Sequence, residues 1–400
     1  DQIFQSWMNE GFEPMFRLGG SAVSDVDVHD FKGPQDKVQE KNWIEAASEV
    51  VKRYLNWKGK PGRFTYLNIW TEFPNDKYWD RSEAAFISFW RKAFESLKDD
   101  FDELMIGGPG FSEEVTRQVM AGSGGVAEDW LGELYKRGVK PDWIGWHLYS
   151  NDPQEFLRAA SAYAELLAGA GQYKDVSWTG SGFFEDSLQI VDAWGNTPMF
   201  VSLGGGWEFM SIVDVDRIYN RKEGASTMTA SWIAMQHSPV ERAFYDRFGD
   251  RNSDPTVAPD SVNTLLSMIG SKGLFYGDTA GTYKRSAHAA RLWARMVNEF
   301  SAELASEPSV NVVDGQVGQR LWMLAGAAPD GRKAVLVSNP NEVAVRWMVR
   351  FGESQAMANH FSGVEIFQVD GNKDGKKSLL YAGEAFKIPA GTVQLVVFTP

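Results

Sequence analysis

The sequence predicts an α/β barrel followed by a smaller antiparallel β-sandwich. Up to about residue 305, apolar strand-like runs alternate with segments whose apolar residues recur at helical spacing. This alternation is typical of a parallel (β/α)8 TIM-type barrel rather than of a sandwich. Beyond that point, period-two runs are separated by Pro-Asp-Gly, Asn-Pro-Asn and Pro-Ala-Gly turns. We therefore expect a barrel domain over residues 1–305 and a β-sandwich domain over residues 306–400.

The barrel elements follow in order along the chain. An amphipathic helix is expected over 3–8, and the clearest later helix is 82–97, where apolar residues recur at helical spacing behind the capping residue Ser82. Six segments read as strands, each apolar and ending at glycine, proline or polar residues. These candidate strands are 15–20, 64–70, 104–109, 142–150, 197–203 and 242–246.

The number of candidate strands is lower than a closed barrel requires. A barrel of this type has about eight strands, and the chain opens in what reads as the helix after the second strand. An open barrel would expose strand edges and an apolar interior to water. Either a second chain or a removed segment completes the barrel, or the first two strands lie elsewhere in this sequence.

The most informative motif is a carboxylate at the end of the run 64–70. Trp70, Thr71 and Glu72 precede a Pro74-Asn75 turn. A glycosidic oxygen is a poor leaving group and must be protonated as its bond breaks. A carboxyl group at the C-terminal end of a strand, desolvated by aromatic neighbours, can hold that proton near neutral pH. The other interpretation is a solvated glutamate in a polar turn.

These residues resemble the Trp-Asn-Glu-Pro signature of retaining glycoside hydrolases. The order of the surrounding segments is similar to family 39, the β-xylosidase and iduronidase-like group, over most of the chain. The resemblance implies that Glu72 is the general acid/base and that His147 and Tyr149, in the run 142–150, face the sugar. It also implies a closing helix near residue 283 and a C-terminal β-domain that covers a flank of the barrel. Asn75 and Tyr245 complete the candidate substrate-binding residues.

The chain departs from the family pattern where the nucleophile is expected. The family carries a glutamate after the run 197–203, and here Leu203 or Gly204 occupies that position. A leucine cannot form a glycosyl-enzyme intermediate. Glu208 follows three glycines that permit unusual backbone paths, so it is the candidate second catalytic carboxylate. The alternatives are that Glu208 is an ordinary loop residue, and that the nucleophile has been lost or substituted. In addition, Thr71 replaces the family's sugar-binding asparagine.

Aromatic residues are abundant, with 16 Trp, 12 Tyr and 25 Phe. Their flat apolar faces suit the stacking of sugar rings. Tryptophans at helical core spacing are expected to pack inside the protein, whereas five others lie at strand ends or in loops. These five stacking candidates are Trp70, Trp146, Trp178, Trp194 and Trp207.

Charge and composition exclude several classes of partner. The net charge is −13 with a pI near 5.0, and no Lys/Arg cluster is interleaved with aromatic residues. We therefore expect neither nucleic acid nor an anionic membrane as partner. Arg17, near a strand end, is expected in a surface ion pair rather than in a cation pocket. No apolar run is long enough to span a bilayer.

The residues that commonly bind metals show no metal-site pattern in this sequence. The chain has no cysteine, which excludes disulfides and thiolate metal sites, and its five histidines show no ligand spacing. The segment 370–375 begins like a calcium loop but lacks the glutamate at the twelfth position, and its flanks alternate like hairpin strands. We predict a turn there, no metal and no cofactor. An acidic, cysteine-free, Trp-rich chain is compatible with a bacterial periplasmic or secreted protein.

Two functions from different classes remain after these observations. The first is an O-glycoside hydrolase that acts on a poly- or oligosaccharide, with Glu72 as acid/base and a displaced or substituted nucleophile. The second is a non-catalytic carbohydrate-binding or assembly subunit that has kept the barrel. A second carboxylate opposite Glu72 would distinguish them.

Overall fold

The computed structural model describes residues 1–9, 11–19, 32–57, 64–76, 78–196, 200–203, 206–209, 212–246, 274, 283–305, 320–349, 361–380 and 386–400. The chain forms two compact units, and each is described by itself. The first contains Asp1–Leu148, Arg158–Trp194 and Ser238–Phe244, and the second contains Tyr149–Leu157, Gly195–His237 and Tyr245–Pro400.

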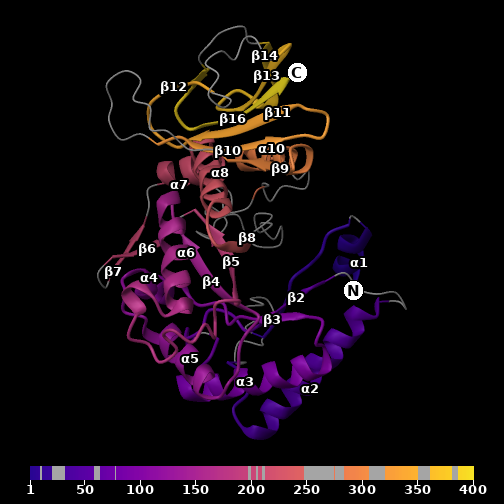
Figure 1. Cartoon of the computed structure of the whole chain (residues 1–400), viewed down its shortest axis with the longest axis vertical. Helices are drawn as coiled ribbons and strands as arrows, with labels where there is room; N and C mark the ends of the chain where they lie inside the picture. Colours follow the sequence, from indigo (N-terminus) through magenta and orange to yellow (C-terminus); the bar gives the residue numbers. More distant parts are fainter. Residues whose placement is uncertain are drawn as a thin grey trace, which may run out of the picture. The chain divides into compact units, whose positions relative to one another are not determined.

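The first unit is built on a six-stranded sheet with the strand order β1-β2-β3-β4-β5-β8 (Figure 1). Strands β1 to β4 pair in parallel. Strand β5 continues the parallel arrangement, because the backbone of Leu188 bonds to Asp142 where both strands begin. The strands are β1 (Phe16–Leu18), β2 (Tyr66–Ile69), β3 (Met105–Gly107), β4 (Trp143–Tyr149), β5 (Leu188–Gly195) and β8 (Val240–Tyr245).

Helices connect these strands, as a parallel sheet requires. Helix α3 packs on β2 and β3 and is flanked by α2 and α5 (Figure 1). The predicted cap is present, because the Ser82 side chain accepts a hydrogen bond from the backbone N–H of Ala85. The helices are α1 (Gln2–Asn9), α2 (Lys37–Leu55), α3 (Glu83–Asp100), α4 (Glu113–Met120), α5 (Gly125–Lys136) and α6 (Pro153–Ala168), followed by the 3-10 turn η2 (Gly171–Tyr173).

An aromatic core lies between α3 and the sheet. Phe86 stacks on Phe73 with ring centroids 3.8 Å apart, and Trp90 donates a hydrogen bond to the carbonyl of Ile69 at 3.1 Å. Phe86 and Trp90 are fully buried, as their helical spacing predicts. The core therefore fixes the end of β2, from which Glu72 follows.

The predicted seventh strand is wrong in its position. The six-stranded sheet contains β5, Leu188–Gly195, between β4 and β8, and the sequence analysis assigned no strand there. Residues 197–199 lie outside the described residues, and Phe200–Leu203 forms β6, which pairs antiparallel with β7 (Gly206–Phe209) in a separate two-stranded sheet. The charged residue Asp192 interrupts the apolar run of β5, so this strand does not read as a buried one.

The second unit contains the predicted antiparallel sandwich. One six-stranded sheet has the order β14-β13-β16-β11-β10-β9, and β12 pairs with β15 in a smaller sheet. Residues 370–373 join β13 to β14, which confirms the hairpin predicted for the segment 370–375. The strands are β9 (Ala302–Leu304), β10 (Trp322–Ala327), β11 (Lys333–Asn339), β12 (Val345–Trp347), β13 (Gly363–Val369), β14 (Asp374–Leu380), β15 (Phe386–Ile388) and β16 (Thr392–Thr399).

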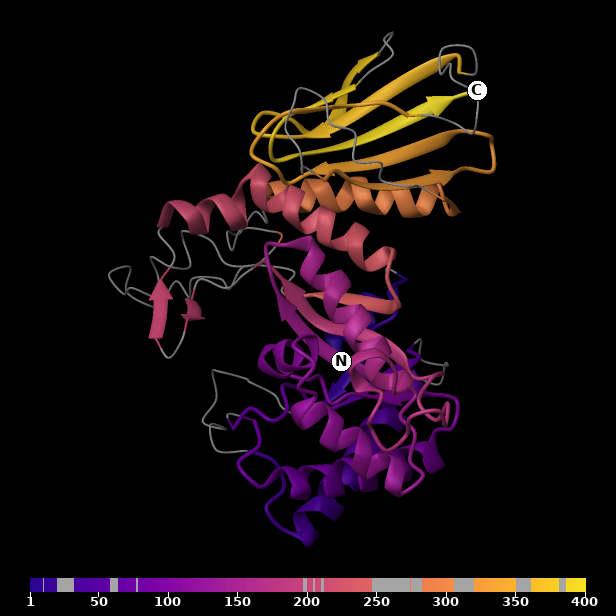
Figure 2. The ribbon, with the colours of Figure 1, turned by 60° about the vertical axis from the view of Figure 1, so that its left-hand side comes forward.

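Both faces of the large sheet are covered. The small sheet covers one face, where Trp347 stacks on Phe386 and both pack with Phe398 and Val335. Helices α8 and α10 lie along the sheet (Figure 2), and the Ser338 hydroxyl of β11 donates to a backbone carbonyl of α8 at 2.6 Å. The helices of this unit are α7 (Ile212–Asn220), α8 (Lys222–Gln236) and α10 (Arg285–Glu299).

The predicted fold class is confirmed as a TIM-like barrel sheet with helices, joined in sequence to an antiparallel β-sandwich. The domain boundary after residue 305 stays a prediction, and β9, which ends just before it, pairs with β10. The prediction that a second chain, a removed segment or another part of the sequence provides the remaining barrel strands also stays untested. Among the helices in the described ranges, none combines the length and apolar character needed to cross a membrane.

Candidate active site

Glu72 lies just beyond the C-terminal end of β2, on a strained turn. Trp70 and Glu72 have φ angles of 78° and 50°, a left-handed region that side chains rarely occupy. Each such residue costs about 1–3 kcal/mol, and strain of this kind concentrates at functional sites. The Trp70 ring fixes the turn, because it fills the space beside Gly19, where a Cβ atom would lie 2.2 Å from the indole.

Two neighbours fix the carboxylate of Glu72. Its Oε2 accepts a hydrogen bond from Asn75 Nδ2 at 3.1 Å, and the backbone N–H of Asn75 donates to the Glu72 carbonyl at 2.7 Å. Its Oε1 lies 3.5 Å from Nδ1 of His147, and the side chain is 29% exposed. Glu72 is therefore held in one orientation while it remains accessible to solvent.

His147 connects Glu72 to a second, buried carboxylate. The imidazole lies on β4 and is 2% exposed, and its Nε2 is 3.4 Å from Oδ2 of Asp192 on β5. Both contacts of the ring are longer than ordinary hydrogen bonds, which are about 2.7–3.2 Å. They are ion-pair contacts when the imidazole is protonated.

Asp192 is completely buried in the first unit. Its Oδ2 accepts hydrogen bonds from Asn68 Nδ2 at 2.8 Å and from Arg17 Nη2 at 3.1 Å. Two glycines leave room for the carboxylate, since a Cβ atom would lie 2.6 Å from Oδ2 at Gly110 and 2.9 Å from Oδ1 at Gly145. The sequence thus provides both the polar partners and the space that a buried charge needs.

Electrostatics give His147 and Asp192 opposite charges. Burial by itself would lower the pKa of His147, but Asp192 and then Glu72 outweigh it and raise that pKa to about 9. Burial would likewise raise the pKa of Asp192, but the opposing effects of His147, Arg17 and Asn68 lower it. At neutral pH, His147 is protonated and Asp192 is ionised.

Of the predicted site residues, the structure brings Glu72, Asn75 and His147 together. It does not support sugar stacking on Trp70 or Trp146, because both indoles are fully buried. The Trp70 ring packs against Trp79 and other aromatic residues, and the Trp146 ring stacks on Tyr163 with centroids 5.5 Å apart. Burial also removes Trp178 and Trp194 as stacking candidates.

The remaining predicted residues lie in the second unit. There the Tyr149 hydroxyl donates a hydrogen bond to Oδ2 of Asp246 at 2.9 Å, and Tyr245 ends β8. Trp207 and Glu208 lie on β7 and Leu203 on β6, but their side chains fall outside the described part of the chain, as does Gly204. The nucleophile positions therefore stay predictions.

Sequence reasoning missed the importance of three residues, namely Asp192, Asn68 and Arg17. The expected surface ion pair of Arg17 is wrong, because its partner is a fully buried carboxylate. A signal was present in the sequence, since Asp192 is a charge inside the apolar run 188–195. A charge in such a run is buried only if partners from other strands compensate it.

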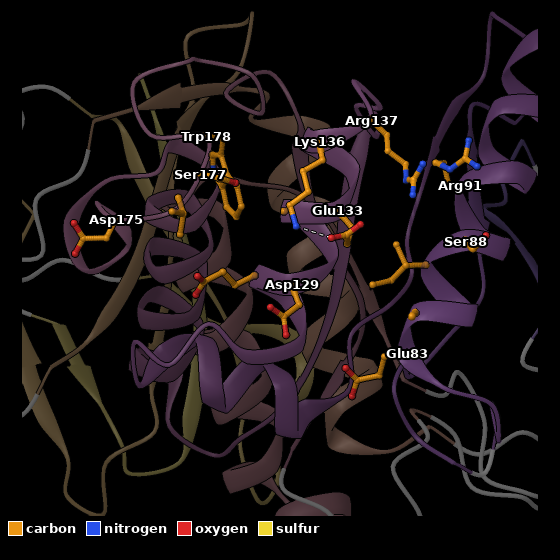
Figure 3. A pocket seen from close by; sticks show the side chains of 15 residues that line it. Glu83, Ser88, Arg91, Asp129, Glu133, Lys136, Arg137, Asp175, Ser177 and Trp178 are labelled. Atoms are coloured by element: carbon orange, nitrogen blue, oxygen red, sulfur yellow. Dashed lines mark hydrogen bonds and ion pairs between the residues drawn. The ribbon is translucent and has the colours of Figure 1, made fainter.

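A surface hollow lies elsewhere on the first unit, between α3, α5 and the segment 175–178 (Figure 3). It has a volume of about 570 Å³, and it is lined by charges of both signs, among which Lys136 and Glu133 pair at 2.6 Å. Glu72, His147 and Asp192 do not line it. The hollow is therefore separate from the candidate active site.

Solved structures with a similar fold include glycoside hydrolases. A glucosidase from Croceicoccus marinus is 15% identical, with a TM-score of 0.62, and the match covers 100% of this chain and 81% of that one. A GH39 β-xylosidase from Caulobacter crescentus is 14% identical, with a TM-score of 0.63 and coverage of 100% and 82%. The GH39 enzyme from Xanthomonas axonopodis pv. citri is 12% identical, with a TM-score of 0.60 and the same coverage.

The chain has a family-39-like glycosidase fold. At these identities the likeness concerns the fold. Searches against protein-family models and curated protein sequences found no match. The assignment of catalytic residues therefore depends on the geometry around Glu72.

Proposed function

We propose that this protein is an O-glycoside hydrolase in which Glu72 is the general acid/base. The observation that carries this proposal is the position of Glu72, beyond the C-terminal end of a parallel strand, where barrel enzymes build their active sites. The carboxylate is partly exposed, oriented by Asn75 and in contact with a protonated histidine. The fold shared with glucosidases and xylosidases supports a carbohydrate substrate.

In this mechanism Glu72 protonates the glycosidic oxygen as the bond breaks, and afterwards removes a proton from the attacking water. Asn75 keeps the carboxylate in one rotamer during both steps. A retaining reaction also needs a nucleophile about 5 Å from the acid/base. Glu208 remains our proposal for that role, and secretion remains our proposal for the location of the protein.

One observation favours a second candidate function, a carbohydrate-binding or assembly subunit without catalysis. Two carboxylates contact His147, those of Glu72 and Asp192. The Asp192 side chain is fully buried, so it cannot serve as the nucleophile that attacks a sugar. The expected nucleophile position is occupied by Leu203 or Gly204. If the glycine-rich segment supplies no second carboxylate, the barrel would bind a sugar without cleaving it.

The substitution Glu72→Gln tests the proposal. Glutamine keeps the shape of the side chain but carries no acidic proton, so kcat on unactivated glycosides should fall about 10²- to 10⁴-fold. Binding of the same oligosaccharide, followed by calorimetry, should change little. Turnover is measured on xylo-, gluco- and arabino-oligosaccharides, with the exposed residue Glu103 changed to Gln as a control.

Two outcomes contradict this assignment. Unchanged turnover in Glu72→Gln would show that another group supplies the proton. A parent protein that binds an oligosaccharide but cleaves none of the panel would support the binding subunit. In that case Leu203→Glu and Gly204→Glu would test whether a restored carboxylate creates hydrolysis, and Glu208→Gln would show whether a relocated nucleophile exists.

A further inference from the structure

Both ring nitrogens of His147 face carboxylate oxygens. Nδ1 lies 3.5 Å from Oε1 of Glu72, and Nε2 lies 3.4 Å from Oδ2 of Asp192. A neutral imidazole has one N–H and one lone pair, so one of these contacts would be repulsive if both carboxyl groups were ionised. One additional proton, on the imidazole or on one of the two carboxyl groups, removes this repulsion. Because the pKa of Asp192 is lowered, the proton is on the imidazole or on Glu72.

We propose that His147 stores the proton that Glu72 delivers, and that Asp192 is the buried positioning residue that keeps this store filled. The proposal rests on the function proposed above for Glu72. It identifies His147 as the source of the proton, and it gives a role to Asp192, a buried carboxylate that does not contact the substrate.

The two proton positions are tautomers of one pair. In the first, the imidazolium of His147 faces an ionised Glu72. In the second, Glu72 is a carboxylic acid whose O–H donates to Nδ1, while Nε2–H still faces Asp192. The proton belongs to the pair, which titrates as a unit, so either form retains it.

Substrate binding would favour the second tautomer. Glu72 is 29% exposed, so water stabilises the ion pair in the free protein. A sugar ring placed over the carboxylate removes that water, and a neutral hydrogen-bonded pair tolerates the loss better than two charges do. The proton then moves from Nδ1 to Oε1 without entering from solvent.

The proton balance closes over one reaction cycle. Glu72, protonated by His147, transfers its proton to the glycosidic oxygen as the C–O bond breaks and the proposed nucleophile bonds to the anomeric carbon, which leaves Glu72 ionised and His147 neutral. In the second half of the reaction, water loses a proton to Glu72 as it attacks the anomeric carbon and displaces the nucleophile. That proton returns to the pair, and the starting state is restored.

The groups around His147 are consistent with this assignment. Asp192 faces it from β5 and Glu72 from the segment after β2, and both raise its pKa. Arg17 from β1 contacts Asp192 rather than the imidazole. From α6, Tyr163 stays neutral because burial raises the pKa of its hydroxyl. Asp192 is therefore the fully buried anion that faces the other ring nitrogen of His147.

The first test is independent of activity. In ¹⁵N NMR of the full chain, with His147 assigned by its loss in His147→Gln, the imidazole should titrate at about 9. Asp192→Asn keeps the shape and removes the charge, so the pKa of His147 should fall by about 1–3 units. Asp186→Asn, at an exposed aspartate paired with Lys140, should leave it unchanged.

The second test is the pH profile of kcat/KM on the best oligosaccharide. If His147 stores the proton, the alkaline limb in the parent coincides with the pKa of His147, and Asp192→Asn shifts both by the same amount. A purely structural role of Asp192 would lower the rate without moving the limb. If Asp192→Asn does not fold, Glu72→Gln, at a partly exposed side chain, should also lower the pKa of His147.

The outcomes separate the two proposals. A His147 pKa near the ordinary value of about 6.5 overturns the proton store, whatever the activity. An alkaline limb that stays in place while the His147 pKa moves overturns it as well. A protein with the expected His147 titration but no hydrolysis contradicts the proposed function, and it leaves the buried pair as a feature of a binding protein.

Discussion

At the scale of single residues, the charge on His147 is the most informative property of this protein. A buried imidazole normally loses its proton, because the interior solvates charge poorly. Here an ionised aspartate at 3.4 Å and a glutamate at 3.5 Å reverse that tendency. The same contacts connect the candidate catalytic residue to the interior of the barrel sheet, so we expect stability and the proposed activity to depend on the same groups.

Stability should therefore depend on pH through His147. Its folded pKa is about 9, above the ordinary value of 6.5, so the folded state binds the proton more tightly than the unfolded state does. The contribution of this proton to the free energy of unfolding is fully present below pH 6.5 and is lost as the pH rises through 9. Asp192 has a lowered pKa, so its contribution is present above about pH 3.9 and is lost as the pH falls through the folded value.

Denaturant unfolding between pH 5.5 and pH 9.5 measures this effect. The parent should lose free energy of unfolding steadily above pH 6.5, and His147→Gln should lack that slope. Parallel curves for the two proteins would show that His147 does not carry the predicted charge.

Gly110 should be intolerant of any side chain. Its φ is +62°, and a Cβ atom would lie 2.6 Å from Oδ2 of Asp192 and 3.3 Å from Nε2 of His147. Gly138 is a matched control, with φ +66° and nothing within 4 Å of the same atom. Gly138→Ala should cost only about 1–2 kcal/mol of backbone strain.

Gly110→Ala should cost about 3–5 kcal/mol more than this control, because it also displaces a buried ion pair. Urea unfolding of the two variants gives the difference directly. If both variants lost the same free energy of unfolding, the Asp192 carboxylate would be able to move without penalty. That result contradicts its positioning role.

At the scale of elements, side-chain caps mark where α2, α3 and α4 begin. Asp36, with an extended φ of −144°, precedes α2, and its carboxylate accepts hydrogen bonds from the N–H groups of Val38 and Gln39, each at 2.8 Å. These two donors would otherwise lack a partner within the helix. Ser82 caps α3 with one such bond, from the N–H of Ala85.

Asp36→Ala should therefore lower the free energy of unfolding by about 1 kcal/mol, within the range of about 0.5–2 kcal/mol for lost caps. Asp36→Ser, which retains an acceptor, should recover most of the loss. The comparison is made by thermal unfolding at one pH. A serine variant as unstable as the alanine variant would show that charge rather than capping matters here.

At the scale of the whole molecule, the charge of −13 and the pI near 5.0 govern which polymers can approach. A chain of this charge is repelled by polyanions at neutral pH. A heparin column at pH 7 and about 0.15 M salt, where the Debye length is about 8 Å, should not retain the protein. Retention should appear at pH 4.5, below the pI. Retention at pH 7 would reveal a cationic site that the net charge hides.

The sequence by itself determined much of the architecture, because the responsible interactions are local. Helical spacing and a serine cap predicted α3, and the carboxylate after an apolar run predicted the position of Glu72. Turn residues between alternating strands predicted the sandwich. These signals depend on residues within a few positions of one another, so they can be read without knowledge of the fold.

Only the tertiary structure decided which groups surround Glu72. Asp192 bonds to Asn68 and Arg17, which are 124 and 175 positions away in the chain. The apolar run 197–203 resembles a seventh strand, but the strand beside β4 is β5, which carries the buried charge of Asp192. A buried carboxylate is stable only where distant partners compensate the loss of water, and no local pattern states which partners the fold will supply.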